Sequence, residues 1–334
     1  MFVNAHTHLY SGLASLGMPE PAEAPRNFLQ ILERIWWRLD RALDEPALRA
    51  SARYYVAHAK EGGTAVLVDH HESPLFIEGS LDVLADACAE FGVAAVLCYG
   101  ATERNGGRDE ASRGLSECRR FILSNRRPGV TGVVGLHASF TVSDETVRAA
   151  GTLCRDLGTV LHVHLAEDGA DVEDARRRGY AGPLERLMAL DALPAGSILA
   201  HGVHLSVSQV RAASDAGCWL VQNPRSNRNN RVGYPRALGA AARVALGTDG
   251  FPSDMRDEAR ALVEAASEAG EPAAAPESRL DAGWRLAAER LGTAAAKPAG
   301  PGSATGVADA DLAGALERVD AEAREQAERL WRRW

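Results

Sequence analysis

Four short segments of the chain carry residue types that bind cations and move protons. In chain order they are His6-Thr7-His8, His162-Val163-His164-Leu165-Ala166-Glu167, His201 and Asp249. Each of them follows an apolar run with the character of a strand. In a barrel of alternating strands and helices, the carboxyl ends of the strands converge on the face that holds the active site. Imidazoles and a carboxylate that meet there predict a site for a divalent cation with one position open to water.

The spacing of His6 and His8 is the first part of this hypothesis. In a strand, residues two apart point to the same face, with Cβ atoms about 7 Å apart, so both rings can reach one cation. Such a pair alone is a weak signal, because two interior histidines bonded to their neighbours have the same pattern. Its place at the end of the first predicted strand favours the functional interpretation.

The other three segments supply groups for proton transfer and charge stabilisation. Glu167 lies three residues after His164, so a turn near Leu165 is needed to bring it over the site, where a desolvated carboxylate suits proton transfer. The alternative is that Glu167 begins a solvated loop. His201 is either a further ligand or a donor to the substrate atom that develops charge. Asp249, in Gly-Thr-Asp-Gly, can touch the metal and accept the proton of its bound water.

Further polar residues follow other strand-like runs and are expected near the substrate, although each can equally be a satisfied interior residue. We expect His162 and His204 to be structural. The residues expected to shape the pocket are His70, His71, His137 and the segment Asn223-Pro224-Arg225-Ser226-Asn227. A helix predicted over 28–43 is inserted after the first strand, with an apolar stripe that includes Trp36. Trp37 lies off that stripe and is the candidate for a lid over the substrate, whereas simple packing of this helix on the barrel is the alternative.

Alternating strand-like and helix-like runs must position these residues. The strand-like runs are Phe2–Ala5, Ala65–Asp69, Ala94–Tyr99, Val130–Leu136, Val160–Val163, Ser197–Ala200, Trp219–Gln222 and Val244–Leu246. The amphipathic runs between them are Glu45–Glu61, Leu81–Phe91, Arg113–Ser124, Asp144–Leu157, Leu184–Met188 and Ser206–Ala216. Together they predict an α/β fold, a (β/α)8 TIM-like barrel. A doubly wound sheet is the competing fold, but it would not place the first and last strands side by side, as the cation requires.

The composition changes after the last strand. We predict a barrel domain over 1–270 and a helical C-terminal extension over 271–334. The segments 271–276 and 293–306 are rich in Ala, Gly and Pro and predict linkers. The segment 309–334 predicts a long amphipathic helix, acidic in its first turn and basic in its last.

Charge and composition exclude several classes of function. The net charge of −8 gives no basic footprint for nucleic acid or for an anionic membrane, and no apolar run approaches membrane-spanning length. Five scattered cysteines without a C-x-x-C pair indicate reduced thiols, so a cytoplasmic location is expected. Lys60 and Lys297 are the only lysines, and they fall in a helical run and a linker. No strand can therefore supply a carboxylated lysine as a bridge between two metals, which predicts one cation.

With these residues assembled, the chain resembles the amidohydrolase superfamily, in its mononuclear aminohydrolase and chlorohydrolase branch. It looks most similar to a group of aminohydrolases associated with selenium metabolism and purine breakdown. The motifs that carry the resemblance are Asn4–Ser11, Leu136–Asp144, Asn223–Asn227 and Gly247–Gly250. The resemblance implies that His6, His8, His164 and Asp249 bind one divalent cation, with Zn expected first and Fe second. It implies that Glu167 shuttles protons, that His201 steadies the oxygen formed, and that Asn223 and His137 lie near the pocket.

The expected reaction is attack by a metal-bound hydroxide on a nitrogen heterocycle or cyclic amidine, with release of ammonia. Ring opening of a cyclic amide is the alternative within enzymes, and a non-catalytic barrel scaffold or regulatory subunit is the alternative of another class. Members of the family usually carry a small β-sandwich outside the barrel. Only five residues precede His6, and the C-terminal segment has the sequence pattern of helices. The sequence therefore predicts no sandwich, and it leaves open a homo-oligomer, a partner chain or the final helix as the cover for that end.

Overall fold

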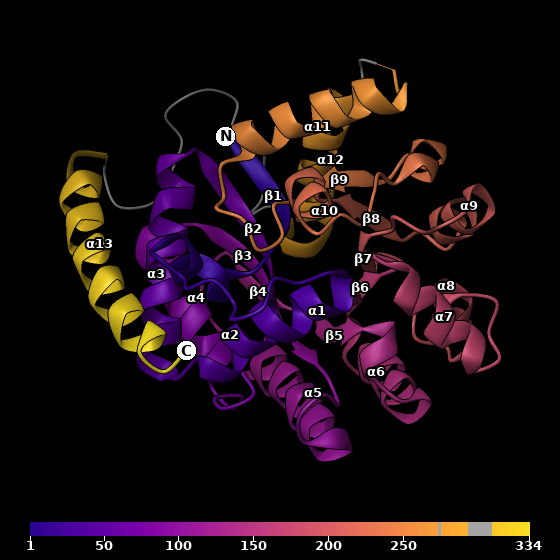
Figure 1. Cartoon of the computed structure of the whole chain (residues 1–334), viewed down its shortest axis with the longest axis horizontal. Helices are drawn as coiled ribbons and strands as arrows, with labels where there is room; N and C mark the ends of the chain where they lie inside the picture. Colours follow the sequence, from indigo (N-terminus) through magenta and orange to yellow (C-terminus); the bar gives the residue numbers. More distant parts are fainter. Residues whose placement is uncertain (273–274, 293–308) are drawn as a thin grey trace.

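Nine parallel strands form a single sheet that curls into a nearly closed barrel (Figure 1). The structure is a computed structural model that describes residues 1–272, 275–292 and 309–334. The strands are β1 (Phe2–Thr7), β2 (Thr64–His71), β3 (Ala94–Ala101), β4 (Val130–Gly132), β5 (Val134–Ala138), β6 (Leu161–Leu165), β7 (Ile198–His201), β8 (Trp219–Gln222) and β9 (Val244–Leu246). Their order is β1-β2-β3-β5-β6-β7-β8-β9, and β4 pairs with β3. The predicted (β/α)8 barrel is confirmed, except that the run Val130–Leu136 is two strands rather than one.

Helices connect consecutive strands and cover the outside of the barrel. Between β1 and β5 they are η1 (Leu9–Ser15), α1 (Phe28–Ile31), η2 (Leu32–Trp36), α2 (Trp37–Ala42), α3 (Glu45–Glu61), α4 (Ser80–Phe91) and α5 (Gly107–Ser124). After β5 they are η3 (Ser139–Thr141), α6 (Asp144–Leu157), α7 (Gly169–Arg177), α8 (Pro183–Ala189), α9 (Val207–Asp215), α10 (Pro224–Asn229), η4 (Arg236–Ala240) and α11 (Met255–Ala269). The helix predicted over 28–43 is interrupted by the π-helical segment η2, and α7 was not predicted.

Local sequence explains where individual helices begin and end. In α6, the Ser143 side chain accepts a hydrogen bond from the Thr146 backbone N–H, which satisfies a donor that the first turn leaves free. The same helix ends at Gly158 in the left-handed conformation with φ 60°, where glycine carries no steric penalty. These boundaries fix the point at which the chain enters β6 and hence the place of His164.

The barrel closes where the end of β9 meets β1. Thr7 pairs with Asp249 in an isolated parallel bridge, and the Tyr55 hydroxyl joins the side chains of Thr7 and Thr248 across the seam. Gly247 lies in this seam, where an added Cβ would sit 2.7 Å from both the His6 backbone N and its carbonyl oxygen. This close approach of two backbones holds His6 and Asp249 next to each other.

We expect Gly247→Ala to destabilise the fold by roughly 1–3 kcal/mol, because backbone at the seam must move to admit the methyl group. Urea unfolding of the purified protein measures this change. Gly239→Ala is the matched control, since a Cβ there meets nothing closer than the Glu271 carboxylate at 3.8 Å. Equal stabilities of the two variants would show that the seam is less tightly packed than described.

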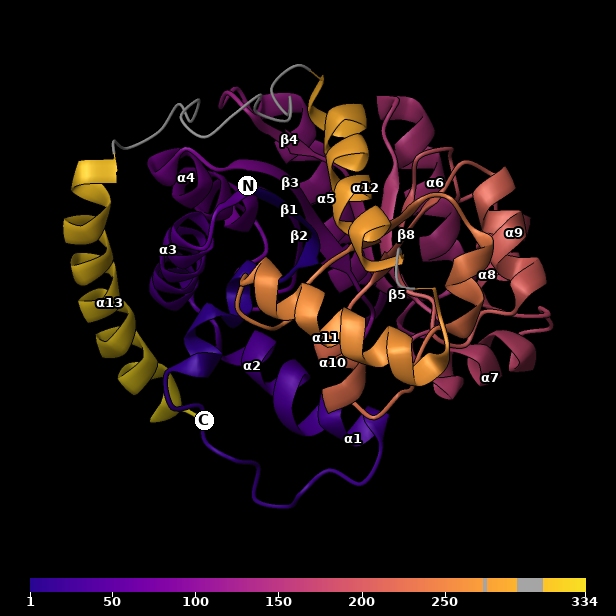
Figure 2. The same cartoon turned by 90° about the horizontal axis from the view of Figure 1, so that it is seen from above.

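Two helices follow the last strand and pack on different parts of the barrel. In α12 (Ala275–Leu291), Trp284 packs with Val3 of β1, and the helix also contacts β9. This packing favours placing α12 with the barrel, while the boundary at residue 270 stays a prediction. The predicted linker 293–306 lies outside the described residues. In both views α13 (Asp309–Trp331) runs along α3 (Figure 2), where Asp320 contacts His58 and Trp331 donates to the Leu16 carbonyl.

The barrel sheet contains every strand of the residues that the structure describes, so no β-sandwich is present in that part of the chain. Within this chain, α12 rather than the final helix covers β1. Among the described helices, none combines the length and the apolar character needed to cross a membrane.

Candidate active site

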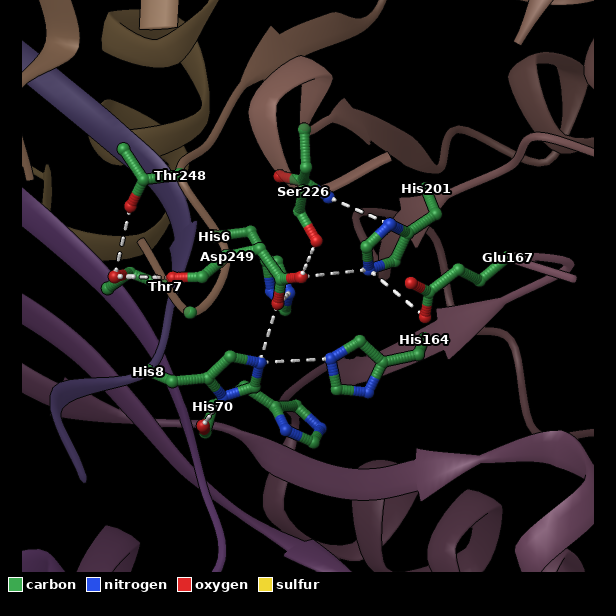
Figure 3. Close-up of polar contacts among 12 residues, drawn as sticks. His6, Thr7, His8, His70, His164, Glu167, His201, Ser226, Thr248 and Asp249 are labelled. Atoms are coloured by element: carbon green, nitrogen blue, oxygen red, sulfur yellow. Dashed lines mark hydrogen bonds and ion pairs between the residues drawn. The ribbon is translucent and has the colours of Figure 1, made fainter. Parts of the chain in front are cut away.

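The structure brings the four predicted ligands together at the carboxyl ends of three strands (Figure 3). His6 and His8 come from the end of β1, His164 from β6, and Asp249 from the turn after β9. One donor atom from each of the four lies within 4.8 Å of the others. His8 Nε2 is 3.2 Å from His164 Nε2 and 2.8 Å from Asp249 Oδ1, which is 3.3 Å from His6 Nε2. Ligands of a tetrahedral zinc ion are about 3.3 Å apart, so this spacing fits one cation.

The outer nitrogen of each ring is already engaged, and this fixes which nitrogen faces the centre. His8 Nδ1 donates to the His70 carbonyl at 2.5 Å, and His164 Nδ1 donates to the His137 carbonyl at 2.6 Å. His6 Nδ1 is 2.9 Å from His162 Nε2. Hydrogen bonds of this kind orient metal-binding histidines and leave Nε2 with its lone pair. His162 therefore lies behind His6 and supports it, as predicted for a structural residue.

The electrostatics of these residues also favour a cation. Burial lowers the pKa of His6 to about 3 and holds the pKa of His164 well below its ordinary value. Burial opposes charge on His8 as well, but its hydrogen bond with Asp249 raises the His8 pKa to about 9. Burial also favours the neutral acid of Asp249, yet the adjacent rings of His6 and His8 keep its pKa well below the usual value. The set thus offers the neutral imidazoles of His6 and His164 beside an ionised carboxylate, and His8 must give up its proton to bind a cation.

The residues fit one divalent cation. His6 Nε2 is buried and accepts or donates no hydrogen bond within the described residues, as expected of a ligand atom. Three other clusters of ligand-type side chains occur in the described part of the chain: His8 with His70 and Glu72, Glu72 with His137 and His164, and Glu167 with His201 and Asp249. Each of these clusters includes one of the four proposed ligands: His8, His164 or Asp249. This sharing supports a single cation.

Glu167 and His201 lie beside the four ligands on the side of β6 and β7. Glu167 Oε2 is 3.6 Å from His201 Nε2, and its Oε1 accepts a hydrogen bond from Asn230 Nδ2 at 3.1 Å. Burial, reinforced by the charge of Asp249, raises the pKa of Glu167 to about 7. His201 Nδ1 donates to Asn227 Oδ1 at 2.9 Å, which leaves Nε2 directed at Glu167 and Asp249. The turn that the sequence requires after Leu165 is present.

Three residues at these strand ends have a strained backbone. Ala166, His201 and Asp249 have φ values of 51°, 75° and 53°, in the left-handed region that residues other than glycine rarely adopt. Such conformations persist where the surrounding structure enforces them, and they cluster at functional sites. Here they turn Glu167, His201 and Asp249 toward one another.

A cavity opens above the proposed ligands, and His8, His164 and Asp249 form part of its wall. Of the predicted substrate-binding residues, Trp37 and His137 line it, with ring centroids 6.1 Å apart. Trp36, assigned by the sequence to the packing stripe, packs against the apolar core and lines the cavity as well. The Arg104 guanidinium stacks on the Trp37 ring at 4.8 Å and holds it in the wall.

Two predicted substrate-binding residues are not among those that line the cavity. The His71 side chain bonds to Ser73 at 2.7 Å and packs against the Tyr99 ring, behind the wall. Asn223 is buried below His201, with its amide 3.4 Å from His201 Nδ1. It therefore supports His201 from behind. His204 is exposed and does not line the cavity.

Three further residues hold the site, of which the sequence named Ser226 and Asn227 only as part of the segment 223–227 and did not name Asn230. Ser226 donates a short hydrogen bond to Asp249 Oδ2, Asn227 orients His201, and Asn230 bonds to Glu167. All three lie on or next to α10, which begins at Pro224. The Asn-Pro-Arg-Ser-Asn segment was the available signal, but its spacing does not show which side chains turn inward.

Comparisons with known proteins agree with this geometry. A model described as the amidohydrolase family matches residues 2–277. The chain is 29% identical over 271 residues to a 5'-deoxyadenosine deaminase from Methanopyrus kandleri, covering 77% of this chain and 58% of that protein. It is 26% identical over 280 residues to an 8-oxoguanine deaminase from Pseudomonas aeruginosa, covering 79% and 61%. The chain thus spans less than two thirds of the length of these relatives.

Solved structures share the fold. The chain superimposes on an adenosine deaminase from Xanthomonas campestris with bound zinc with a TM-score of 0.77 and 20% identity, covering 98% of this chain and 84% of that one. For an atrazine chlorohydrolase from Arthrobacter aurescens complexed with zinc, the TM-score is 0.69 at 20% identity, with 87% and 70% covered. At these identities the likeness establishes the barrel architecture.

Proposed function

Because this chain belongs to the amidohydrolase family, we propose that it is a metal-dependent aminohydrolase that acts on a nitrogen heterocycle or cyclic amidine. The reaction adds water at a ring carbon, forms a carbon–oxygen bond and releases the amino group as ammonia. The observation that carries the proposal is the convergence of His6, His8, His164 and Asp249 on one point, with Glu167 beside them. The resemblance stated from the sequence motifs is confirmed by the family match.

Zinc is the cation we propose, since the two solved structures named above are described with zinc. A divalent cation held by these four residues would lower the pKa of a bound water from 15.7 toward about 7 and so supply a nucleophile at neutral pH. Iron accepts the same ligand set. Asp249 is ionised and accepts the proton that the water gives up.

Glu167 and His201 perform the remaining proton transfer and charge stabilisation. With a pKa of about 7, Glu167 can both take up and give back a proton near neutral pH, so it delivers one to the ring nitrogen next to the attacked carbon. His201 Nε2 faces the same point and, when it carries a proton in addition to the one on Nδ1, it can donate to the substrate oxygen and stabilise the charge that develops there. Trp37 and His137 line the cavity, where their rings can pack against a planar substrate. The names of the two curated relatives support a purine-like ring.

Ammonia release from a panel of aminopurines, aminopyrimidines, pterins and aminotriazines tests the proposal with metal-replete protein. We expect at least one of these rings to release ammonia at a rate proportional to the enzyme concentration. This release should stop when the metal is removed by chelation. Consumption of a cyclic amide without ammonia would favour ring opening instead. Protein that holds no stoichiometric metal and acts on no ring would favour the scaffold. A cytoplasmic location and a homo-oligomer or partner chain stay predictions.

A further inference from the structure

A buried carboxylate on the cavity wall has no part in the proposed reaction. Glu72 follows β2 directly, is 2% exposed and lines the same cavity as Glu167. Its Oε1 atom lies 2.8 Å from His70 Nδ1, but the contact is not aligned as a hydrogen bond, and no other described group bonds to this atom. Its Oε2 atom is 3.8 Å from His8 Nδ1, which is too far for a hydrogen bond.

The fold makes room for this carboxylate. Opposite it on β3 lies Gly100, where an added Cβ would sit 2.4 Å from Glu72 Oε1 and 2.4 Å from the Cε1 atom of His70. Because glycine has no side chain, it is the one residue type that leaves this space beside Glu72 and His70 empty. The Glu72 carboxylate and the His70 ring therefore occupy a place that β3 provides for them.

The chemistry of this carboxylate, which lies in an ion-pair contact with His70, decides which ligand groups it can meet. An ionised carboxylate is an acceptor only and has sites for about four hydrogen bonds. A buried carboxylate with most of these sites unfilled is costly unless a donor meets it. Whatever faces Glu72 in the cavity must therefore bring N–H or O–H groups.

A second cation is not that partner. In the clusters that include Glu72, the other members are His8 with His70, or His137 with His164. His8 and His164 each have their Nδ1 atom bonded to a backbone carbonyl, and their Nε2 atoms face each other at 3.2 Å beside Asp249. They have no further nitrogen to offer beside Glu72.

We propose that Glu72 determines substrate specificity by accepting hydrogen bonds from N–H groups on an edge of the ring remote from the reacting carbon. This inference rests on the proposed function. Glu72 follows β2 and Glu167 follows β6, three strands further in the order of the barrel. A ring that reaches Glu167 with one edge thus turns another edge to Glu72. The substrates favoured are heterocycles with at least two amino or ring N–H groups, over rings that carry alkyl groups at the second edge.

Two triazines of the same shape test this directly. Melamine carries three amino groups, whereas 2-amino-4,6-dimethyl-1,3,5-triazine carries one amino group and two methyl groups of similar size. Each can place an amino group at the reacting carbon, but only melamine has another for Glu72. Binding is measured by calorimetry on zinc-loaded Glu167→Gln protein, in which turnover is expected to be strongly slowed. We expect melamine to bind at least about tenfold more tightly, and Glu72→Gln in the same background to reduce this preference to about threefold or less.

Glu78→Gln is the matched control, because Glu78 is an exposed carboxylate in the same segment between β2 and α4. It should keep the preference for melamine. Circular dichroism and zinc content check that the Glu72 variant folds and holds metal. Three results would each overturn the inference. The first is equal affinity for the two triazines in protein that carries Glu72, and the second is no measurable binding of melamine. The third is a Glu72→Gln variant that keeps the preference for melamine. Failure of the proposed function would instead appear as no ammonia from any ring with wild-type protein.

Discussion

Glu167→Gln is expected to lower kcat for ammonia release by roughly 10²–10⁴-fold, the range contributed by a positioned acid–base group. The amide keeps the shape of the side chain and can still bond to Asn230, but it cannot take up and return a proton. Because Glu167 is not among the four proposed ligands, the variant should retain the metal content of the wild type. Steady-state kinetics and elemental analysis of the same preparation measure both quantities.

The control for this prediction is Glu173→Gln, the same substitution on the exposed face of α7. It should leave both kcat and metal content unchanged. A Glu167→Gln enzyme that works at the wild-type rate would remove Glu167 from the reaction. A variant that loses its metal would instead make Glu167 a ligand.

His6→Ala should abolish both metal binding and activity. Loss of a group that merely supports a ligand weakens metal affinity about 10–100-fold, and loss of the ligand itself should exceed that. The buried Nε2 atom of His6 has no hydrogen bond among the described residues, and the Asp249 oxygen beside it would lose a partner at 3.3 Å. Metal per chain, measured after dialysis against metal-free buffer, should fall from about one equivalent to near zero.

His204→Ala provides the comparison, since this exposed histidine lies in the loop after β7 and outside the cavity wall. Its metal content and activity should match those of the wild type. Retention of a full equivalent of metal by His6→Ala would mean that the three remaining residues suffice or that the cation lies elsewhere.

The chain order of strand-like runs and histidine motifs predicted the barrel and the convergence of His6, His8, His164 and Asp249. This worked because the carboxyl ends of parallel strands must meet, whatever the details of packing. The sequence could not show in the same way which side chain, His70 or His71, points into the barrel. In a barrel both faces of a strand are buried and apolar, so alternation does not tell which residue points inward. The structure places His70 near the other site histidines and His71 against Tyr99.

The residues that hold the site depend on tertiary contacts rather than on spacing. Ser226, Asn227 and Asn230 reach the site because α10 starts immediately after β8 and turns back over it. Glu72 lies on the wall because Gly100, 28 positions along the chain, leaves it room. A single sequence shows the residue types in such segments but not the direction of their side chains.

Anomalous diffraction at the zinc edge, from crystals of zinc-loaded protein, tests the central claim most directly. We expect one strong peak per chain, about 2 Å from His6 Nε2, His8 Nε2, His164 Nε2 and an Asp249 oxygen. An absence of any peak between these four atoms, or a peak coordinated by other residues, would contradict this claim.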